Sequence, residues 1–178
     1  NKGDEDNPEI RCRIVAKEFN TSKREDLFAA TPPLEAKKML FSFAVTEGIG
    51  YKHGKREEGM KLDFIDIRRA YYHAEARRKL YIKLPEGDQE EGMCGVLLKS
   101  LEGTRDAAQN WEYAYSKFLM SIGFERGKAS PCIFTLSSKD LRVVVHGDDF
   151  TVLGHTKDLD WFRQQISDRF TVKFRGRI

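Results

Sequence analysis

The order of strand-like and helix-like segments predicts an α+β domain with a ferredoxin-like arrangement: an antiparallel sheet with helices on one face. Short apolar, β-branched runs alternate with amphipathic helical segments in the order strand–helix–strand–strand–helix–strand. The chain has 178 residues, of which 40% are hydrophobic and 33% are charged. This composition suits one globular domain that buries a core of its own.

The expected elements begin with a disordered lead-in over residues 1–9, which are polar and contain Pro. A strand is expected over about 10–18, and a helix from Pro33 to Gly48 with Leu34, Leu40, Phe41, Ala44 and Val45 on its apolar face. The remaining elements are strand 60–66, a helical turn 68–75, strands 79–84 and 95–99, a helix from Thr104 to Gly123, strands 131–136, 141–146 and 150–153, a helix capped by Thr156, and strand 170–175.

Charge and cysteine content narrow the class of protein. A net charge of +3 permits nucleic-acid binding without requiring it. Cys12, Cys94 and Cys132 are odd in number and lack Cys-x-x-Cys spacing, so free thiols in a reducing compartment are expected, not a zinc site or disulfides. No apolar run approaches the ~20 residues that a membrane helix needs.

Two adjacent carboxylates, Asp148 and Asp149, stand between two β-branched runs. Residues 143–145 (VVV) precede them, Gly147 supplies a turn, and residues 151–152 (TV) follow. This pattern predicts a hairpin with the acidic pair at its tip. Like charges side by side are costly without a cation, and Mg²⁺ prefers hard carboxylate oxygens. On its own, the pair also fits a solvated turn.

A second acidic strand end supplies a third carboxylate. Residues 60–67 (MKLDFIDI) indicate an apolar strand that carries Asp63 and Asp66. Because these two are three residues apart, their side chains point to opposite faces, and only one can join a shared site. Asp66 lies at the strand end, where sites are built. Carboxylates from two segments are the minimum for a two-metal centre, whose chemistry suits nucleotidyl transfer.

Seven segments in order resemble the reverse transcriptase domain of copia-type LTR retrotransposon Pol polyproteins, over nearly the whole chain. They are residues 11–19 (RCRIVAKEF), 25–32 (EDLFAATP), 64–71 (FIDIRRAY), 80–87 (LYIKLPEG), 100–111 (SLEGTRDAAQNW), 123–134 (GFERGKASPCIF) and 146–149 (HGDD). Each motif is weak alone, but their order and spacing are specific. The resemblance implies an RNA-directed DNA polymerase whose palm and partial fingers span residues 10–178, without thumb, connection or RNase H.

The resemblance also implies a role for each matching residue. Asp66, Asp148 and Asp149 are expected to form the catalytic triad and to hold two Mg²⁺ ions, with Mn²⁺ as a substitute. The backbone carbonyl of Ile67 is expected to help hold one ion. Tyr71 falls where the family carries an aromatic gate that selects dNTPs; a core aromatic is the alternative.

Basic and polar residues are expected to contact the substrates. Arg13 and Lys17 lie where positive side chains clamp the incoming triphosphate, although a solvated basic face is an equal alternative. Asp106 stands where the family has a nucleotide-contacting Gln, so Arg105 or Gln109 is expected to take over that contact. Contacts to the primer–template are expected from Arg68, Arg69, His146 and Gly147.

Two functions stay open at this stage. The first is a polymerase core whose partners are an RNA or DNA template with primer, dNTPs, and the thumb, RNase H and integrase of a Pol polyprotein. The second is a non-catalytic nucleic-acid-binding relic. Two departures from the family favour it: His146-Gly147 stands where the family has Tyr-Val before Asp-Asp, and Asp106 stands where it has Gln. The expected location is intracellular: cytoplasmic, in a retrotransposon particle, with nuclear access also open.

Overall fold

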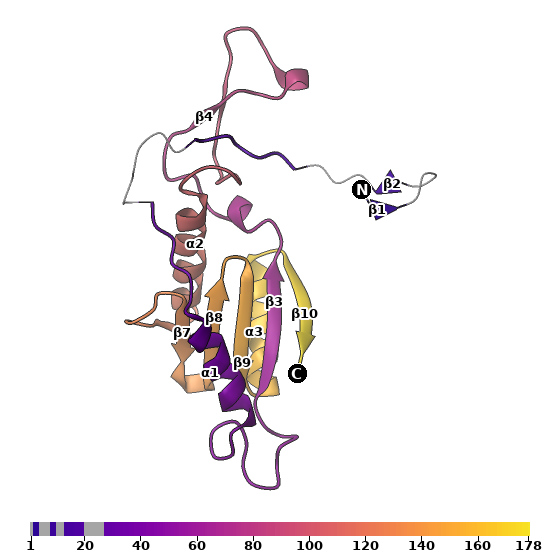
Figure 1. Ribbon diagram of the computed structural model, residues 1–178, viewed down its shortest axis with the longest axis vertical. Helices are drawn as coiled ribbons and strands as arrows, with labels where there is room; N and C mark the ends of the chain where they lie inside the picture. The colour runs from indigo at the N-terminus through magenta and orange to yellow at the C-terminus, as the bar shows by residue number, and fades with distance from the viewer. Residues whose placement is uncertain (1, 4–7, 10–12, 20–26) are drawn as a thin grey trace.

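A six-stranded antiparallel sheet forms the centre of the molecule (Figure 1). The computed structural model describes residues 2–3, 8–9, 13–19 and 27–178. The strand order is β10-β3-β9-β8-β7-β6. These strands are β3 (Lys61–Ile67), β6 (Glu125–Arg126), β7 (Ile133–Leu136), β8 (Leu141–His146), β9 (Asp149–Gly154) and β10 (Val172–Arg177). The predicted α+β class with an antiparallel sheet is therefore confirmed.

Helices cover both faces of this sheet, so the expectation of helices on one face is wrong. Helix α1 (Leu34–Val45) packs on one face, and α2 (Ala107–Ser121) and α3 (Thr156–Arg169) pack on the other (Figure 1). The physical reason is that β3 is apolar on both sides. Its Ile65 and Ile67 join the larger core with α2 and α3, whereas Leu62 joins the smaller core under α1.

The larger core is rich in aromatic rings. Trp111 of α2 meets Tyr115, Phe150 and Phe170 edge to face, with ring centroids 5.1–6.4 Å apart. Edge-to-face pairs add about 1 kcal/mol each beyond the area that they bury. This cluster fixes α2 against β9 and the end of α3, and so fixes the hairpin at one end of β9.

Helix α1 buries only part of the expected apolar face, namely Leu40 and Ala44, which pack in the smaller core. Ala36 and Leu40 are buried, whereas Leu34 and Val45 are 63% and 58% exposed. Phe41 is also largely exposed, and it stacks on Phe64 of β3 with ring centroids 6.1 Å apart. Because the core beneath α1 is small, one narrow stripe of the helix fills it and the other apolar side chains face outward.

Thr104 and Thr156, the N-caps that the sequence pattern favours for α2 and α3, do not cap these helices, although Gly123, with a φ of 98°, follows the end of α2 as expected. The N-cap residues are Asp106 for α2 and His155 for α3, and neither makes a capping hydrogen bond with its side chain. The Thr104 hydroxyl instead donates to the carbonyl of Leu101, at 2.9 Å. Thr156 is the first residue inside α3 and not its cap.

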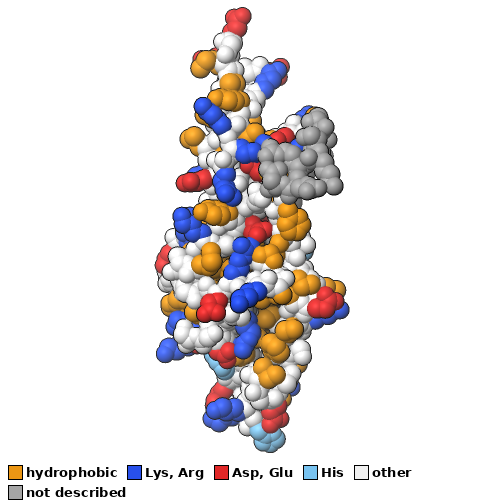
Figure 2. Space-filling view, turned by 90° about the vertical axis from the view of Figure 1, so that its left-hand side faces the viewer, with side chains coloured by type: hydrophobic (Ala, Val, Ile, Leu, Met, Phe, Trp, Pro, Cys, Tyr) orange, Lys and Arg blue, Asp and Glu red, His pale blue; other side chains and the backbone are white. Residues whose placement is uncertain are grey.

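Small elements surround the sheet. They are the strand pairs β1 (Lys2–Gly3) with β2 (Pro8–Glu9) and β4 (Tyr81–Ile82) with β5 (Gly95–Val96), and the 3₁₀ turns η1 (Ala70–His73), η2 (Glu86–Asp88) and η3 (Ser137–Lys139). The β4–β5 pair begins an extension at the top of Figure 1, and Figure 2 shows hydrophobic side chains exposed along it. The strands expected over 79–84 and 95–99 thus shrink to two residues each.

Residues 13–19 do not form the expected strand, and the rest of that strand, residues 10–12, lies outside the described residues. One backbone hydrogen bond, from the amide of Ala16 to the carbonyl of Glu102, ties this segment to the body of the molecule. The described part of the chain offers the segment no neighbouring strand, so a ladder cannot form. Within the described residues, moreover, no helix is both long and apolar enough to cross a membrane.

A buried ion cluster holds β3, α3 and β10 together. Asp63 is fully buried and receives paired hydrogen bonds of 2.6–2.8 Å from Arg163 of α3 and Arg177 of β10. Burial raises the pKa of Asp63, but the hydrogen bonds from Arg177 and Arg163 outweigh it, so this pKa lies below its ordinary value of 3.8. A carboxylate with a depressed pKa stabilises the fold above its unfolded-state pKa and loses this effect as the pH falls through its folded-state pKa.

Asp63→Asn is therefore expected to lower the free energy of unfolding at pH 7 by about 3 kcal/mol, because Arg163 loses its counter-charge and Arg177 keeps only the exposed Asp160 among the described residues. The gap between variant and native chain should begin to narrow as the pH falls below the ordinary value of 3.8, and it should close as the pH passes the lower folded-state pKa of Asp63. Urea titrations at neutral and acidic pH measure both effects. The exposed Asp140→Asn is the control. Equal stability of native chain and Asp63→Asn at pH 7 would contradict this account.

Candidate active site

The acidic hairpin forms as the sequence predicts. Strands β8 and β9 pair from Arg142 opposite Leu153 to His146 opposite Asp149, and they leave Gly147 and Asp148 as the two loop residues. Gly147 has a φ of 64°, the conformation that a type II′ hairpin turn requires at its first loop position. The indole N–H of Trp111 donates to the carbonyl of Gly147 at 2.8 Å. The aromatic core therefore holds the turn from beneath.

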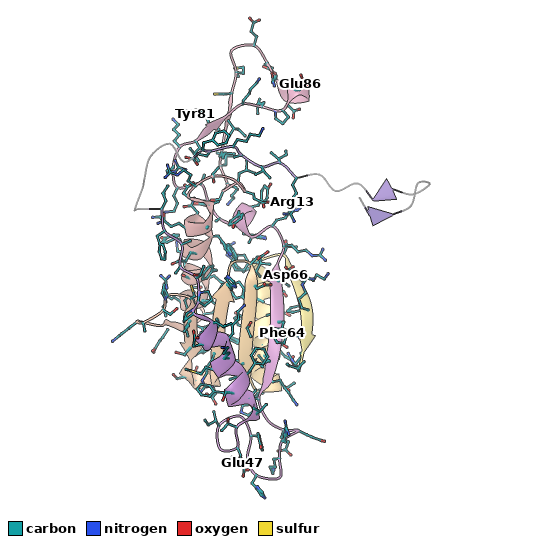
Figure 3. All side chains as sticks on the ribbon, in the orientation of Figure 1. Arg13, Glu47, Phe64, Asp66, Tyr81 and Glu86 are labelled. Atoms are coloured by element: carbon teal, nitrogen blue, oxygen red, sulfur yellow. The ribbon has the colours of Figure 1, made fainter. Side chains whose placement is uncertain are left out.

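The register of β3 with β9 brings two of the three predicted carboxylates together. Asp66 lies directly opposite Asp149, and residues paired in this way project from the same face of the sheet. Asp148 is in the adjoining turn, where its carbonyl accepts a hydrogen bond from the amide of Ile67 at 2.9 Å. Asp63 points to the opposite face, toward Arg163, as its spacing from Asp66 predicts. Figure 3 shows Asp66 at the end of β3.

The oxygen donors at this strand end suit a hard divalent cation, but they do not form a preorganised metal-binding site. Within the described residues, no three His, Cys, Asp or Glu side chains are grouped as metal ligands. The Asp66 carboxylate instead pairs with the guanidinium of Arg175 at 3.1 Å. Arg175 stands at an irregularity in β10, between Phe174 and Gly176, which turns its side chain toward β3. A metal at Asp66 would use the other carboxylate oxygen, Oδ2, or displace this ion pair.

Tyr71 lies at the same end of the sheet, in η1, and packs as the core aromatic that was the alternative to a gate. Its ring packs against the larger core, whereas the neighbouring Tyr72 is exposed. Burial raises the pKa of the Tyr71 hydroxyl, and the charges of Asp148 and Glu102 raise it further. Tyr71 is thus a core aromatic whose ring is close enough to Asp148 to sense its charge.

The segment with Arg13 and Lys17 lies beyond the same end of the sheet, and Figure 3 shows Arg13 above Asp66. The guanidinium of Arg13 is 3.6 Å from the carboxylate of Glu102, and both side chains are largely exposed. Lys17 is exposed. An exposed pair at this distance holds little energy, so Arg13 can exchange Glu102 for another anion at small cost.

An ion cluster anchors this segment to the start of α2. Arg78 donates to both carboxylate oxygens of Glu18, at 3.0 and 2.9 Å, and to Asp106, at 2.8 Å. Glu18 also accepts from the amide of Arg105, and Asp106 accepts from the side chain of Asn110. Asp106 therefore presents no uncompensated charge to a nucleotide. Its burial raises its pKa, but the hydrogen bonds from Arg78 and Asn110 lower it overall.

The other predicted contact residues fall into two groups. Arg68, Arg69, His146 and Gly147 are all exposed around the carboxylates, at the end of β3 and in the hairpin. Arg105 and Gln109 lie at the start of α2, where the Gln109 amide is 3.4 Å from the carbonyl of Phe28. Gln109 thus contacts the chain segment that precedes α1.

The sequence did not predict the contacts of three residues that shape this site. They are Arg175, which pairs with Asp66, and Glu18 and Arg78, which anchor residues 13–19. Arg175 carries no sequence signal, because its approach depends on an irregular strand pairing. A signal for Arg78 did exist: a buried Asp106 would need a cation, and Arg78 is one of the basic residues between the motifs at 64–71 and 80–87.

Similarity to known proteins identifies the family. A family model described as reverse transcriptase (RNA-dependent DNA polymerase) matches residues 1–178. The chain belongs to this family. It is 21% identical over 176 residues to a retrovirus-related Pol polyprotein from transposon TNT 1-94 of Nicotiana tabacum. That alignment covers 93% of this chain and 12% of the tobacco protein. No solved structure matches the chain.

Together, the family match and the tobacco relative confirm the resemblance to a copia-type reverse transcriptase domain. This reverse transcriptase domain spans about an eighth of the curated relative's length, since the alignment covers 12% of it. The carboxylates at the ends of β3 and β9 lie in two of the motifs that carry the resemblance.

Removal of the buried acid should loosen residues 13–19. In Asp106→Ala, Arg78 loses its most buried partner, and its hold on Glu18 weakens. We expect trypsin to cleave after Arg13 and Lys17 several-fold faster than in the native chain, because local opening costs less there. Mass spectrometry of timed digests measures the rates. Asp140→Ala, which removes an exposed carboxylate, should leave them unchanged. Equal rates in Asp106→Ala and the native chain would refute the anchoring role.

Proposed function

We propose that this chain is the polymerase core of a copia-type retrotransposon reverse transcriptase, which adds dNTPs to a primer 3′-hydroxyl on an RNA or DNA template. The observation that carries the proposal is the placement of Asp66 opposite Asp149, with Asp148 in the adjoining turn, in a chain of the reverse transcriptase family. Three carboxylates at one strand end are the donor set that nucleotidyl transfer with two metal ions needs.

In this proposal, Asp66, Asp148 and Asp149 hold Mg²⁺, with the carbonyl of Ile67 beside them. The bound ions would lower the pKa of the attacking hydroxyl and neutralise charge that develops on the phosphate. The chain's own contribution is position. The pairing of β3 with β9 fixes where Asp66 and Asp149 stand, and the bond from Trp111 fixes the turn that carries Asp148. Such positioning removes much of the entropic barrier before reaction.

Positive side chains around the carboxylates complete the proposed substrate site. Arg13 and Lys17 would contact the triphosphate, and Arg105 or Gln109 the nucleotide. Arg68, Arg69, His146 and Gly147 would contact the primer–template. Tyr71 would act as the gate against ribonucleotides, supported by its proximity to Asp148.

The proposed partners are a template with its primer, dNTPs, and the thumb, RNase H and integrase regions of a Pol polyprotein. Support comes from the tobacco relative, which is a Pol polyprotein. The proposed location is the cytoplasm, in a retrotransposon particle, with access to the nucleus.

One observation favours a second candidate, a binding module without catalysis. The Asp66 carboxylate is already paired with Arg175, and the carboxylates are not grouped as metal ligands in the described residues. A module of this kind would retain nucleic-acid contacts from the exposed basic residues but would not need a divalent ion.

Primer extension on poly-rA with an oligo-dT primer tests the proposal. With Mg²⁺ or Mn²⁺, the native chain should incorporate dTTP, and Asp148→Asn should lower incorporation by about 100-fold or more, because a metal ligand is lost. Asp140→Asn, a matched change at another exposed turn, should have no effect. In the same assay, Tyr71→Ala should admit ribonucleotides.

Incorporation that survives in Asp148→Asn would overturn the proposed metal site. If the native chain incorporates nothing but still binds the template, the binding module is supported, unless a longer chain that includes the following polyprotein region restores incorporation. Template affinity is measured in parallel by fluorescence anisotropy.

A further inference from the structure

A pocket of about 330 Å³ lies away from the carboxylates. Its walls come from α2, the segment after η1, Lys99 and the end of α3. Helix α2 packs on the face of the sheet opposite the one from which Asp66 and Asp149 project. In Figure 1 α2 lies on the left, the side that Figure 2 turns toward the viewer, where Lys and Arg side chains are spread along the molecule.

The pocket is strongly basic. Four of its lining residues are cations, namely Arg77, Lys99, Lys117 and Arg169, against one acid, Glu75. The chain as a whole is nearly balanced, with 31 Lys and Arg against 28 Asp and Glu. The excess of positive charge around this pocket is therefore larger than the overall composition of the chain would give.

These four cations lack counter-charges in the part of the chain that the structure describes. None forms an ion pair there, whereas Arg78, Arg126, Arg163 and Arg177 all pair with carboxylates. Two of the four pocket cations, Arg169 and Lys99, repel the protonated form of His73, which lines the same pocket. Burial lowers the pKa of His73, and the charges of Arg169 and Lys99 lower it further. The pocket thus has a positive potential that an anion would relieve.

An aromatic surface accompanies the charge. The guanidinium of Arg77 lies 4.6 Å from the centre of the Tyr113 ring, and Tyr113 is 53% exposed. A stacked guanidinium and ring offer a flat surface to a nucleobase, while neighbouring cations hold phosphates. The combination matches single-stranded nucleic acid better than a purely acidic peptide, which has no base to stack.

We propose that this pocket is a second nucleic-acid site, which binds the phosphodiester backbone of a single strand through Lys99, Lys117 and Arg169 and a base on the Arg77–Tyr113 surface. It goes beyond the proposed polymerase function, because a strand bound there lies on the opposite face from the carboxylates. The site would hold a stretch of template or product away from the carboxylates.

The test is anisotropy with a fluorescein-labelled oligo-rA of about 15 nucleotides, long enough to fill one single-strand site. EDTA is present throughout, so that metal-dependent chemistry plays no part. The variant carries Lys99→Gln, Lys117→Gln and Arg169→Gln together. A control of equal charge change carries Lys52→Gln, Lys128→Gln and Lys157→Gln, at exposed positions elsewhere. Thermal unfolding verifies that both variants are folded.

The pocket variant should bind about tenfold more weakly than the native chain, and its salt slope should be smaller by about 2, since each phosphate contact to a single strand contributes about 0.7. The control should change less than twofold. Equal losses in the two variants, or no loss in the pocket variant, would overturn the proposal. So would full displacement of the strand by free ATP at equal phosphate concentration, which would indicate a nucleotide site instead.

A second readout locates the bound strand directly. Ultraviolet cross-linking of an RNA that contains 4-thiouridine should give adducts on the peptide with Tyr113 in the native chain and in Asp148→Asn alike. Adducts confined to peptides with Asp66 or Asp148 would refute the second site. Because binding and cross-linking need no catalysis, the two proposals can fail independently: the pocket can bind RNA in a chain that extends no primer.

Discussion

The pairing of β3 with β9 is the constraint on which the site depends. One register places Asp66 opposite Asp149 and the amide of Ile67 against the carbonyl of Asp148. A slip by one residue would send Asp66 to the other face and bury its carboxylate among the aromatic rings of the larger core. The register is held from both faces, because Ile65 and Ile67 pack under α2 and α3 while Leu62 packs under α1.

Two buried acids, each paired with arginine, fix further elements around this strand pairing. Asp63 ties β3 to α3 and β10 through Arg163 and Arg177, and Asp106 ties α2 to residues 13–19 through Arg78. Buried ion pairs add little net stability compared with apolar packing, but breaking one is costly, so each favours a single arrangement. The carboxylate end of the sheet is thereby framed by elements that are far apart in the sequence.

The sequence predicted what depends on local pattern and on motif order. The hairpin at Gly147, the opposite orientation of Asp63 and Asp66, and the antiparallel sheet follow from period-two alternation and from turn chemistry. What it missed depends on tertiary packing. The apolar residues of β3, such as Leu62 and Ile65, do not reveal in the sequence that a helix covers each face of the sheet. No spacing rule predicts that Arg175, in an irregular part of β10, contacts Asp66. The sequence suggests only nearby residues as partners of Asp106, whereas Arg78, which neutralises the charge of Asp106, lies 28 residues away in the chain.

The central claim is that the ends of β3 and β9 form one metal site, and cleavage by bound iron tests it most directly. Fe²⁺ that replaces Mg²⁺ generates hydroxyl radicals, which cut the backbone close to the ion when ascorbate and peroxide are supplied. The account predicts cuts near both Asp66 and Asp148, protected by excess Mg²⁺ and lost in Asp66→Asn. Cuts at only one of these segments, or a pattern unchanged in Asp66→Asn, would contradict a shared site.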